Sequence, residues 1–170
     1  MSQSVAPAPV RRRAMDRLVT GIQRHWLAGI NIFFGVLLGV AMLTPLAYAL
    51  GFSSLGDSVF HLYRFICGQT PSHSFFLGGY QMCLCSRCMA IYSSMLIAGV
   101  AFAILRNARS FQPARWYWWV LGMVPLALDG GTQLVGWHES NLALRLLTGA
   151  VFGLSTAWFL FPQIEESTRL

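Results

Sequence analysis

Four long apolar runs constrain this chain more than any other feature of its sequence. The runs cover residues 26–50, 89–106, 116–135 and 141–162, and their interiors carry almost no charge. A membrane-spanning helix needs about 20 mostly apolar residues, so each run is long enough to cross a bilayer. Charged residues make up only 11% of the chain, against roughly 25% in soluble domains. The sequence therefore predicts an all-α bundle of four transmembrane helices.

The placement of arginine predicts how this bundle is oriented. All 12 basic residues are arginine, and most lie in two places: before the first run (Arg11, Arg12, Arg13, Arg17, Arg24) and between the second and third (Arg106, Arg109, Arg115). Because cytoplasmic loops carry such an excess, both termini are predicted to face the cytoplasm, in the inner membrane. These positions suit anionic lipid headgroups, which argues against nucleic-acid binding as the reason for the net charge of +6.

The predicted domain organisation is simple. At 170 residues the chain is expected to hold one membrane domain, residues 25–170, after a disordered basic tail, residues 1–24. The loop over residues 51–87 then lies on the extracytoplasmic side and is longer than a compact bundle needs. Its segment 57–67 has the pattern of a short amphipathic or re-entrant helix, with Asp57, His61 and Arg64 on one face. Gly78-Gly79 marks a further turn before the cysteines.

The four cysteines are the strongest local signal for chemistry. Cys67, Cys83, Cys85 and Cys88 all fall in or beside this loop. Four thiolates can hold one zinc ion in a tetrahedral shell, and histidine can replace a thiolate there. The same residues could form disulfides or a redox pair in an oxidising compartment, or pack as small apolar side chains. His61 and His73 are alternate ligands, although either could be an ordinary polar surface residue.

Two ionisable residues lie inside the predicted spans. Asp129 and Arg145 fall at matching depths of the third and fourth runs, so an ion pair between them is predicted. Gln133 and Thr148 extend this intramembrane polar network, which is either a structural clamp or a functional pocket. Pairs of glycines four residues apart, at 35 and 39 and at 149 and 153, permit close helix contact, and they are also common filler in membrane helices.

From Phe60 to Pro162 the chain resembles a family of prokaryotic membrane proteins, domain of unknown function 2085. The resemblance is carried by Cys67-Gly68-Gln69-Thr70-Pro71, Ser74-Phe75-Phe76, Cys85-Ser86-Arg87-Cys88, Ile91-Tyr92, the segment 125–133 and the segment 139–149. The family pattern has histidine at position 68, arginine at 73, Thr-Gly at 89–90 and no cysteine at 83. The resemblance thus implies a three-cysteine, one-histidine set that has lost its histidine and gained a cysteine, which favours a metal site.

Two classes of function follow from these features. The first is a structural or binding membrane protein whose loop is held by a metal ion, with zinc as the expected metal, and which serves as an accessory subunit or a homo-oligomer in the bilayer. The second is an enzyme: a thiol-disulfide or quinone-linked oxidoreductase, or a lipid-modifying enzyme that uses the pocket around Asp129 and Arg145. The sequence contains no motif that identifies catalytic residues.

Overall fold

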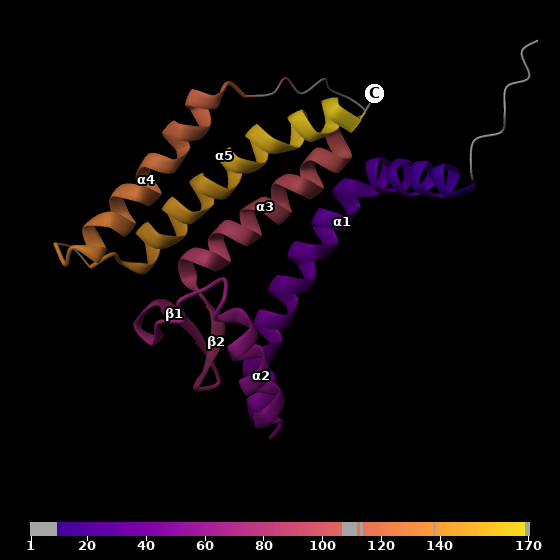
Figure 1. Cartoon of the computed structure of the whole chain (residues 1–170). Coiled ribbons are helices and arrows are strands. Elements are labelled where there is room, and N and C mark those ends of the chain that lie inside the picture. The colour runs from indigo at the N-terminus through magenta and orange to yellow at the C-terminus, as the bar shows by residue number, and fades with distance from the viewer. Residues whose placement is uncertain (1–9, 107–111, 113, 138, 169–170) are drawn as a thin grey trace, which may run out of the picture.

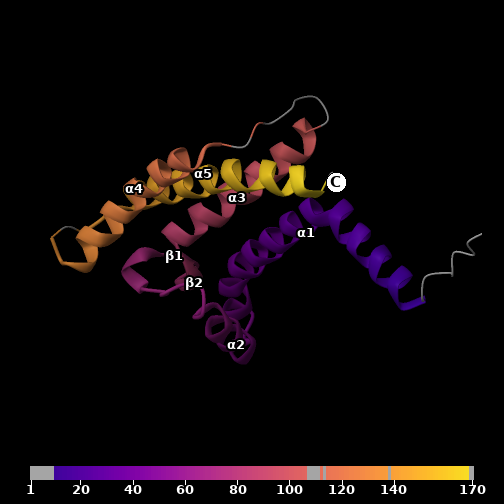
Figure 2. The same ribbon diagram turned by 45° about the horizontal axis from the view of Figure 1, so that its top comes forward.

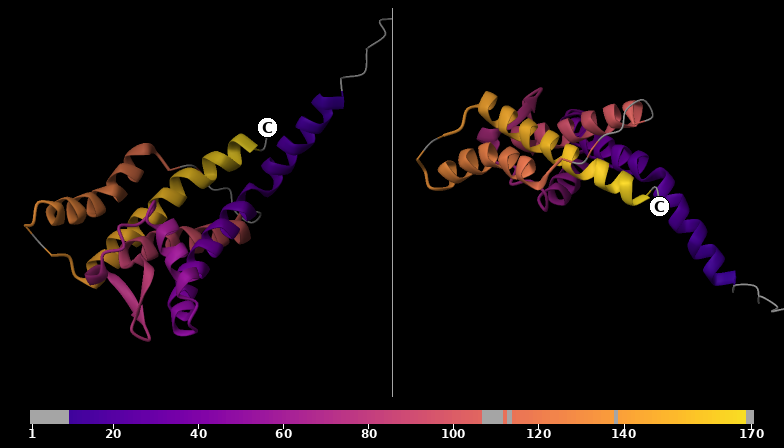
Figure 3. Two further views of the ribbon diagram at one scale, coloured as in Figure 1. Left: turned by 60° about the horizontal axis from the view of Figure 1, so that its bottom comes forward. Right: turned by 90° about the horizontal axis from the view of Figure 1, so that it is seen from above.

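The computed structural model describes residues 10–106, 112, 114–137 and 139–168. Helices dominate the described residues, and a small hairpin interrupts them (Figure 1). The elements are α1 (Val10–Ala49), α2 (Ser53–Tyr63), the 3-10 turn η1 (Pro71–His73), β1 (Ser74–Leu77), β2 (Tyr80–Cys85), α3 (Ser86–Leu105), α4 (Trp116–Leu134) and α5 (Leu142–Thr168). Helix α5 packs between α3 and α4, while α1 packs on α3. Figures 2 and 3 show α2 and the hairpin at the end of the bundle where α3 begins.

Three of these helices are long and apolar enough to cross a membrane. They are His25–Ala49 within α1, Ser86–Leu105 and Leu142–Thr168. Helix α4 forms where the third span was predicted. Among the described residues, however, it is not one of the helices that are both long and apolar enough to cross a membrane. Its Trp116-Tyr117-Trp118-Trp119 start, Pro125 and Asp129 lower the mean hydropathy. The structure therefore supports three spans, one fewer than the sequence predicted.

The basic segment before the first span differs from the prediction of a disordered tail. Helix α1 begins at Val10, so helix covers residues 10–24 as well; residues 1–9 and Arg109 lie outside the described part. Arginine, leucine, methionine and alanine are good helix formers. Once the apolar span has nucleated a helix, extending that helix over such residues costs less free energy than nucleating a new one.

The hairpin corrects the prediction of an all-α fold. Strands β1 and β2 pair antiparallel, and Gly78-Gly79 joins them at φ values of +59° and +85°. Two consecutive left-handed residues suit the right-handed twist of paired strands, and glycine adopts them without strain. The pairing shifts between Ser74 and Phe76, so the strand ends irregularly where Cys85 leads into α3. Apolar and aromatic residues flank Gly-Gly, which is a signal for a hairpin, but only a turn was predicted there.

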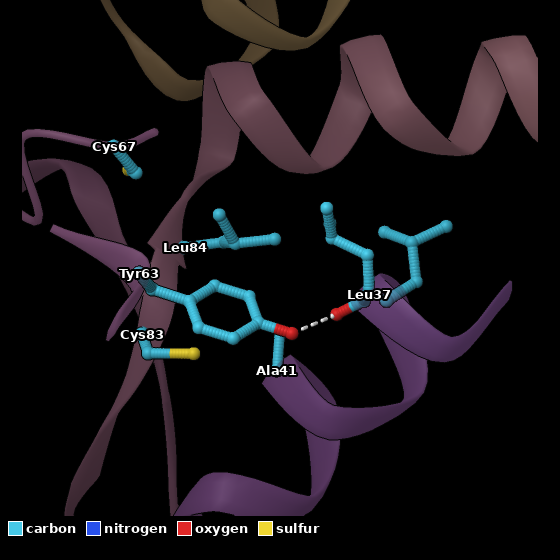
Figure 4. Packing of buried hydrophobic residues seen from close by; sticks show 7 residues of the cluster. Leu37, Ala41, Tyr63, Cys67, Cys83 and Leu84 are labelled. Atoms are coloured by element: carbon cyan, nitrogen blue, oxygen red, sulfur yellow. Dashed lines mark hydrogen bonds between the residues drawn. The ribbon is translucent and has the colours of Figure 1, made fainter. Parts of the chain in front are cut away.

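A small core joins α1, α2 and β2 beneath the hairpin. The buried side chains of Leu37, Ala41, Tyr63, Cys83 and Leu84 meet there (Figure 4). The Tyr63 hydroxyl donates a hydrogen bond of 2.7 Å to the Leu37 carbonyl oxygen. Burial raises the pKa of Tyr63 to about 12, so this hydroxyl stays a donor at neutral pH. The core fixes the end of α2 against α1, and thereby the position of Cys67 four residues later.

Candidate metal centre

Three cysteine thiols converge at the start of α3. Cys67 follows α2, Cys85 ends β2 and caps α3, and Cys88 lies in the first turn of α3. Their sulfur atoms all lie within 4.8 Å of one another. Cys67 is buried, Cys85 and Cys88 are half-buried, and all three thiols are free. Because the sulfurs come from two separate segments, the one after α2 and the β2–α3 junction, a group bound by them would tie the loop to the bundle.

Local hydrogen bonds place these thiols. The backbone N–H of Cys67 donates to the Tyr63 carbonyl at 3.0 Å, which continues the last turn of α2. The backbone N–H of Cys85 donates to the Cys67 sulfur at 3.2 Å. Hydrogen bonds between the thiols shift their pKa values in opposite directions. Those from the Cys67 and Cys88 side chains lower the pKa of Cys85, and the hydrogen bond between Cys67 and Cys85 raises the pKa of Cys67. Negative charge on the three-thiol group therefore collects first on Cys85.

Gln69 holds the segment after Cys67 in place. Its side-chain amide donates to the carbonyl oxygens of Phe60 at 2.9 Å and Cys83 at 3.1 Å. Its own carbonyl accepts a hydrogen bond of 2.8 Å from the Gln81 side chain. Gln69 has φ of +50°, a conformation that costs a residue other than glycine about 1 to 2 kcal/mol. One residue thus connects α2, β2 and the cysteine segment, a role that sequence reasoning missed.

We expect Gln69→Ala to loosen this loop by about 1 to 3 kcal/mol, because two partly buried carbonyls, those of Phe60 and Cys83, each lose a hydrogen bond. Amide hydrogen exchange over residues 60–85 and the rate of thiol alkylation measure the loosening. Gln69→Gly is the matched variant, since it loses the same hydrogen bonds but relieves the left-handed backbone. It should be less destabilised than Gln69→Ala. Wild-type exchange rates in both variants would exclude the clamp.

The four-cysteine set expected from the sequence is incomplete in the structure. Cys83 is fully buried and its sulfur lies 3.5 Å from the Thr44 hydroxyl of α1, outside the three-thiol group. Burial raises the pKa of Cys83, which suits a neutral thiol packed in the core. The side chain points into the space between β2 and α1 (Figure 4). Among the four, Cys83 thus has the packing role that was one of the alternatives.

The alternate histidine ligands also lie outside the three-thiol group. His61 lines a pocket of about 320 Å³ together with Asp57 and Arg64. His73 reaches α4 instead, where its Nε2 lies 3.2 Å from the Gln133 side-chain nitrogen. Burial, and then the positive charge of Arg145, lower the pKa of His73. His73 is therefore neutral at pH 7 and can accept the hydrogen bond from Gln133.

The intramembrane polar residues are partly rearranged from the prediction. Asp129 forms its ion pair with Arg87, not with Arg145. Arg87 also donates to the Gln133 oxygen at 3.2 Å, which links Asp129, Gln133 and His73 in one network. The predicted partner was wrong because Arg87, at the start of α3, reaches across to α4, and charge spacing along the sequence cannot reveal this. The hydroxyl of Thr148 donates to the Leu144 carbonyl of its own helix at 2.8 Å.

The geometry suits a thiophilic metal. Zinc holds sulfur at about 2.3 Å, so tetrahedral ligands are about 3.8 Å apart, and thiols already within 4.8 Å need little movement. Position 68, where the family pattern has histidine, is open: a Cβ added at Gly68 would meet no atom within 4 Å. In this chain three sulfurs are brought together.

Comparisons with known proteins identify the family. The profile of the DUF2085 family, described as a predicted membrane protein, matches residues 67–159. An uncharacterized protein of Methanocaldococcus jannaschii is 34% identical over 109 residues, which cover 64% of this chain and 69% of the relative. One from Methanothermobacter thermautotrophicus is 34% identical over 95 residues, covering 56% and 84%. No solved structure matches the chain. The matched region begins at Cys67 and contains the whole three-thiol group, and this chain belongs to the DUF2085 family of predicted membrane proteins.

Proposed function

We propose that this protein is a structural or binding membrane protein whose Cys67, Cys85 and Cys88 hold a zinc ion. The observation that carries the proposal is the convergence of three free thiols from two separate chain segments. A disulfide would join only two of them and leave the third thiol unused. A metal uses all three, because each thiolate contributes one bond to the same ion.

The ion would act as a staple between the loop and the bundle. Cys67 closes the segment after α2, while Cys85 and Cys88 belong to the junction of β2 and α3. Binding free energy at such a site stabilises the fold directly, because the unfolded chain does not bring the ligands together. Water or a donor atom of a partner would complete the shell. The protein would then serve as an accessory subunit or homo-oligomer with a rigid outer surface.

The proposed orientation puts this centre on the extracytoplasmic side of the inner membrane. Arginine-rich segments flank the opposite ends of α1, α3 and α4, as the positive-inside rule requires of cytoplasmic ends. Helix α4 is proposed as a fourth crossing, packed along α5. Its Asp129 is buried and paired with Arg87, which reduces the cost of a carboxylate at membrane depth.

Metal analysis and thiol counting on the purified full-length protein test the proposal. We expect one zinc per chain, three thiols protected from alkylation and slow reaction at the buried Cys83. Removing the ion with a strong chelator should expose the three thiols and lower the thermal stability in detergent. A metal-free protein with a disulfide among Cys67, Cys85 and Cys88 would refute the metal site. Reduction of that disulfide by a quinol would instead support the oxidoreductase.

A further inference from the structure

Arg145 is a buried cation at the same end of the bundle as the three-thiol group. Only 4% of its surface is exposed, and its Nε donates to the Ser140 carbonyl oxygen at 2.9 Å. Among the described residues it forms no ion pair. A charge buried without a counter-charge costs several kcal/mol. Asp129 acts on Arg145 only at longer range, because its direct ion pair is with Arg87.

Helix packing places Arg145 at the start of α3. Gly149, one turn further along α5, lies against α3 so closely that an added Cβ would come within 2.7 Å of the Arg87 carbonyl oxygen. Arg145 precedes Gly149 by four residues and so lies on the same face of α5, one turn closer to the beginning of that helix. Its guanidinium interacts electrostatically with Arg87, Asp129 and Cys85. The thiol group and the buried arginine thus share one end of the bundle.

The charged groups around Arg145 carry one more positive charge than negative charge. Arg87 and Arg145 are two cations, and the buried carboxylate of Asp129, which is paired with Arg87, is the single buried acidic group near them among the described residues. Glu139 is also near, but it is exposed to solvent, which screens its charge. One positive charge stays uncompensated in a low-dielectric setting. Three thiolates around one divalent ion carry a single negative charge, which compensates it.

We propose that Arg145 is the counter-charge of the Cys67, Cys85 and Cys88 centre, and that the centre therefore takes a divalent ion with a neutral fourth ligand. This inference rests on the proposed function, because it assigns the charge of the same metal site. Arg145 acts as a positioning residue and touches no ligand atom. A monovalent ion would leave the centre with two negative charges, and a trivalent ion would leave it neutral, so neither matches the single positive charge of its surroundings.

Zinc affinity of Arg145 variants, measured by chelator competition on the full chain in detergent, tests the proposal. Outer ligand-sphere partners typically contribute 10- to 100-fold to metal affinity, so we expect Arg145→Gln to weaken zinc binding by about tenfold or more. Arg145→Lys keeps the charge and loses the Nε hydrogen bond, so it should retain most of the affinity. Arg64→Gln is the control, since Arg64 is an exposed arginine in the same loop region, and it should bind zinc as the wild type does.

The outcomes separate this inference from the proposed function. A wild-type protein without zinc overturns both. Zinc bound to wild type and equally to Arg145→Gln overturns the inference alone. If Arg145→Lys is as weak as Arg145→Gln, the hydrogen bond to Ser140 and not the charge is responsible, and the inference is again overturned. Cobalt substitution distinguishes weaker binding from misfolding. If thiolate-to-cobalt absorption persists in Arg145→Gln, the centre is assembled and only its metal affinity has changed.

Discussion

Cys85→Ser is expected to lower the zinc affinity of this protein by at least about 100-fold. Structural zinc sites bind with roughly 10 to 16 kcal/mol, so the loss of one of three protein ligands removes several kcal/mol. Cys85 has the largest effect of the three because it receives the hydrogen bonds of the other two thiols. Cys67→Ser and Cys88→Ser should also lose the ion. Zinc content after gel filtration, followed by chelator competition, provides the measurement.

Cys83→Ser is the matched control for this series. It removes a thiol two residues from Cys85, but one that contacts Thr44 and lies outside the three-thiol group. We expect zinc binding at wild-type affinity and a modest loss of stability in the core between α1 and β2. If Cys83→Ser loses zinc as readily as Cys85→Ser, the centre has four sulfur ligands and the arrangement described here is wrong.

Gly153→Ala is expected to destabilise the bundle by about 3 kcal/mol, at the upper end of the cost of overpacking. An added Cβ would lie 2.0 Å from the Ser94 hydroxyl and 2.6 Å from the Ile91 carbonyl oxygen. The first contact can be relieved by a rotamer change, but the second involves the backbone of α3. Helices α3 and α5 would have to separate along their most extensive contact. Reversible unfolding in mixed micelles measures the free energy of unfolding.

Gly39→Ala is the control for helix propensity. Gly39 lies in α1, and a Cβ added there would meet no atom within 4 Å. Because alanine is the better helix former by about 1 kcal/mol, this variant should be as stable as the wild type or slightly more stable. Equal stability of Gly153→Ala and Gly39→Ala would show that α3 and α5 are not in the close contact described.

The glycine pairs show what a sequence pattern can and cannot determine. Both pairs have the four-residue spacing that permits helices to approach, at 35 and 39 and at 149 and 153. Only the second pair lies in a close interface, where the α3 backbone fills the space that a side chain would take. The spacing identifies glycines that share one face of a helix. Which face meets another helix depends on the packing of the whole bundle.

The sequence by itself determined where the four long helical runs lie, although α1 starts 16 residues before its predicted start and α5 ends six residues after its predicted end. These features are local, because hydropathy, helix propensity and the Gly-Gly turn act within a short stretch of chain. The cysteine cluster was visible for the same reason. The fourth membrane crossing, predicted for α4, was less well determined. The aromatic residues and Asp129 of this helix lower its mean hydropathy, so hydropathy alone does not identify it as a membrane span.

Only the tertiary structure decided which of these residues act together. Cys67 joins Cys85 and Cys88, while Cys83, closer in sequence to both, turns toward Thr44. Asp129 pairs with Arg87 across helices, and Arg145, which was the predicted partner, donates to the Ser140 carbonyl oxygen instead. Which thiols and charges come together depends on the direction of each side chain and on the irregular end of β2. Neither can be predicted from the spacing of residues in the sequence. The physical reason is that the interaction of a buried charge or thiol depends on distances of a few ångströms between segments that are remote in the sequence.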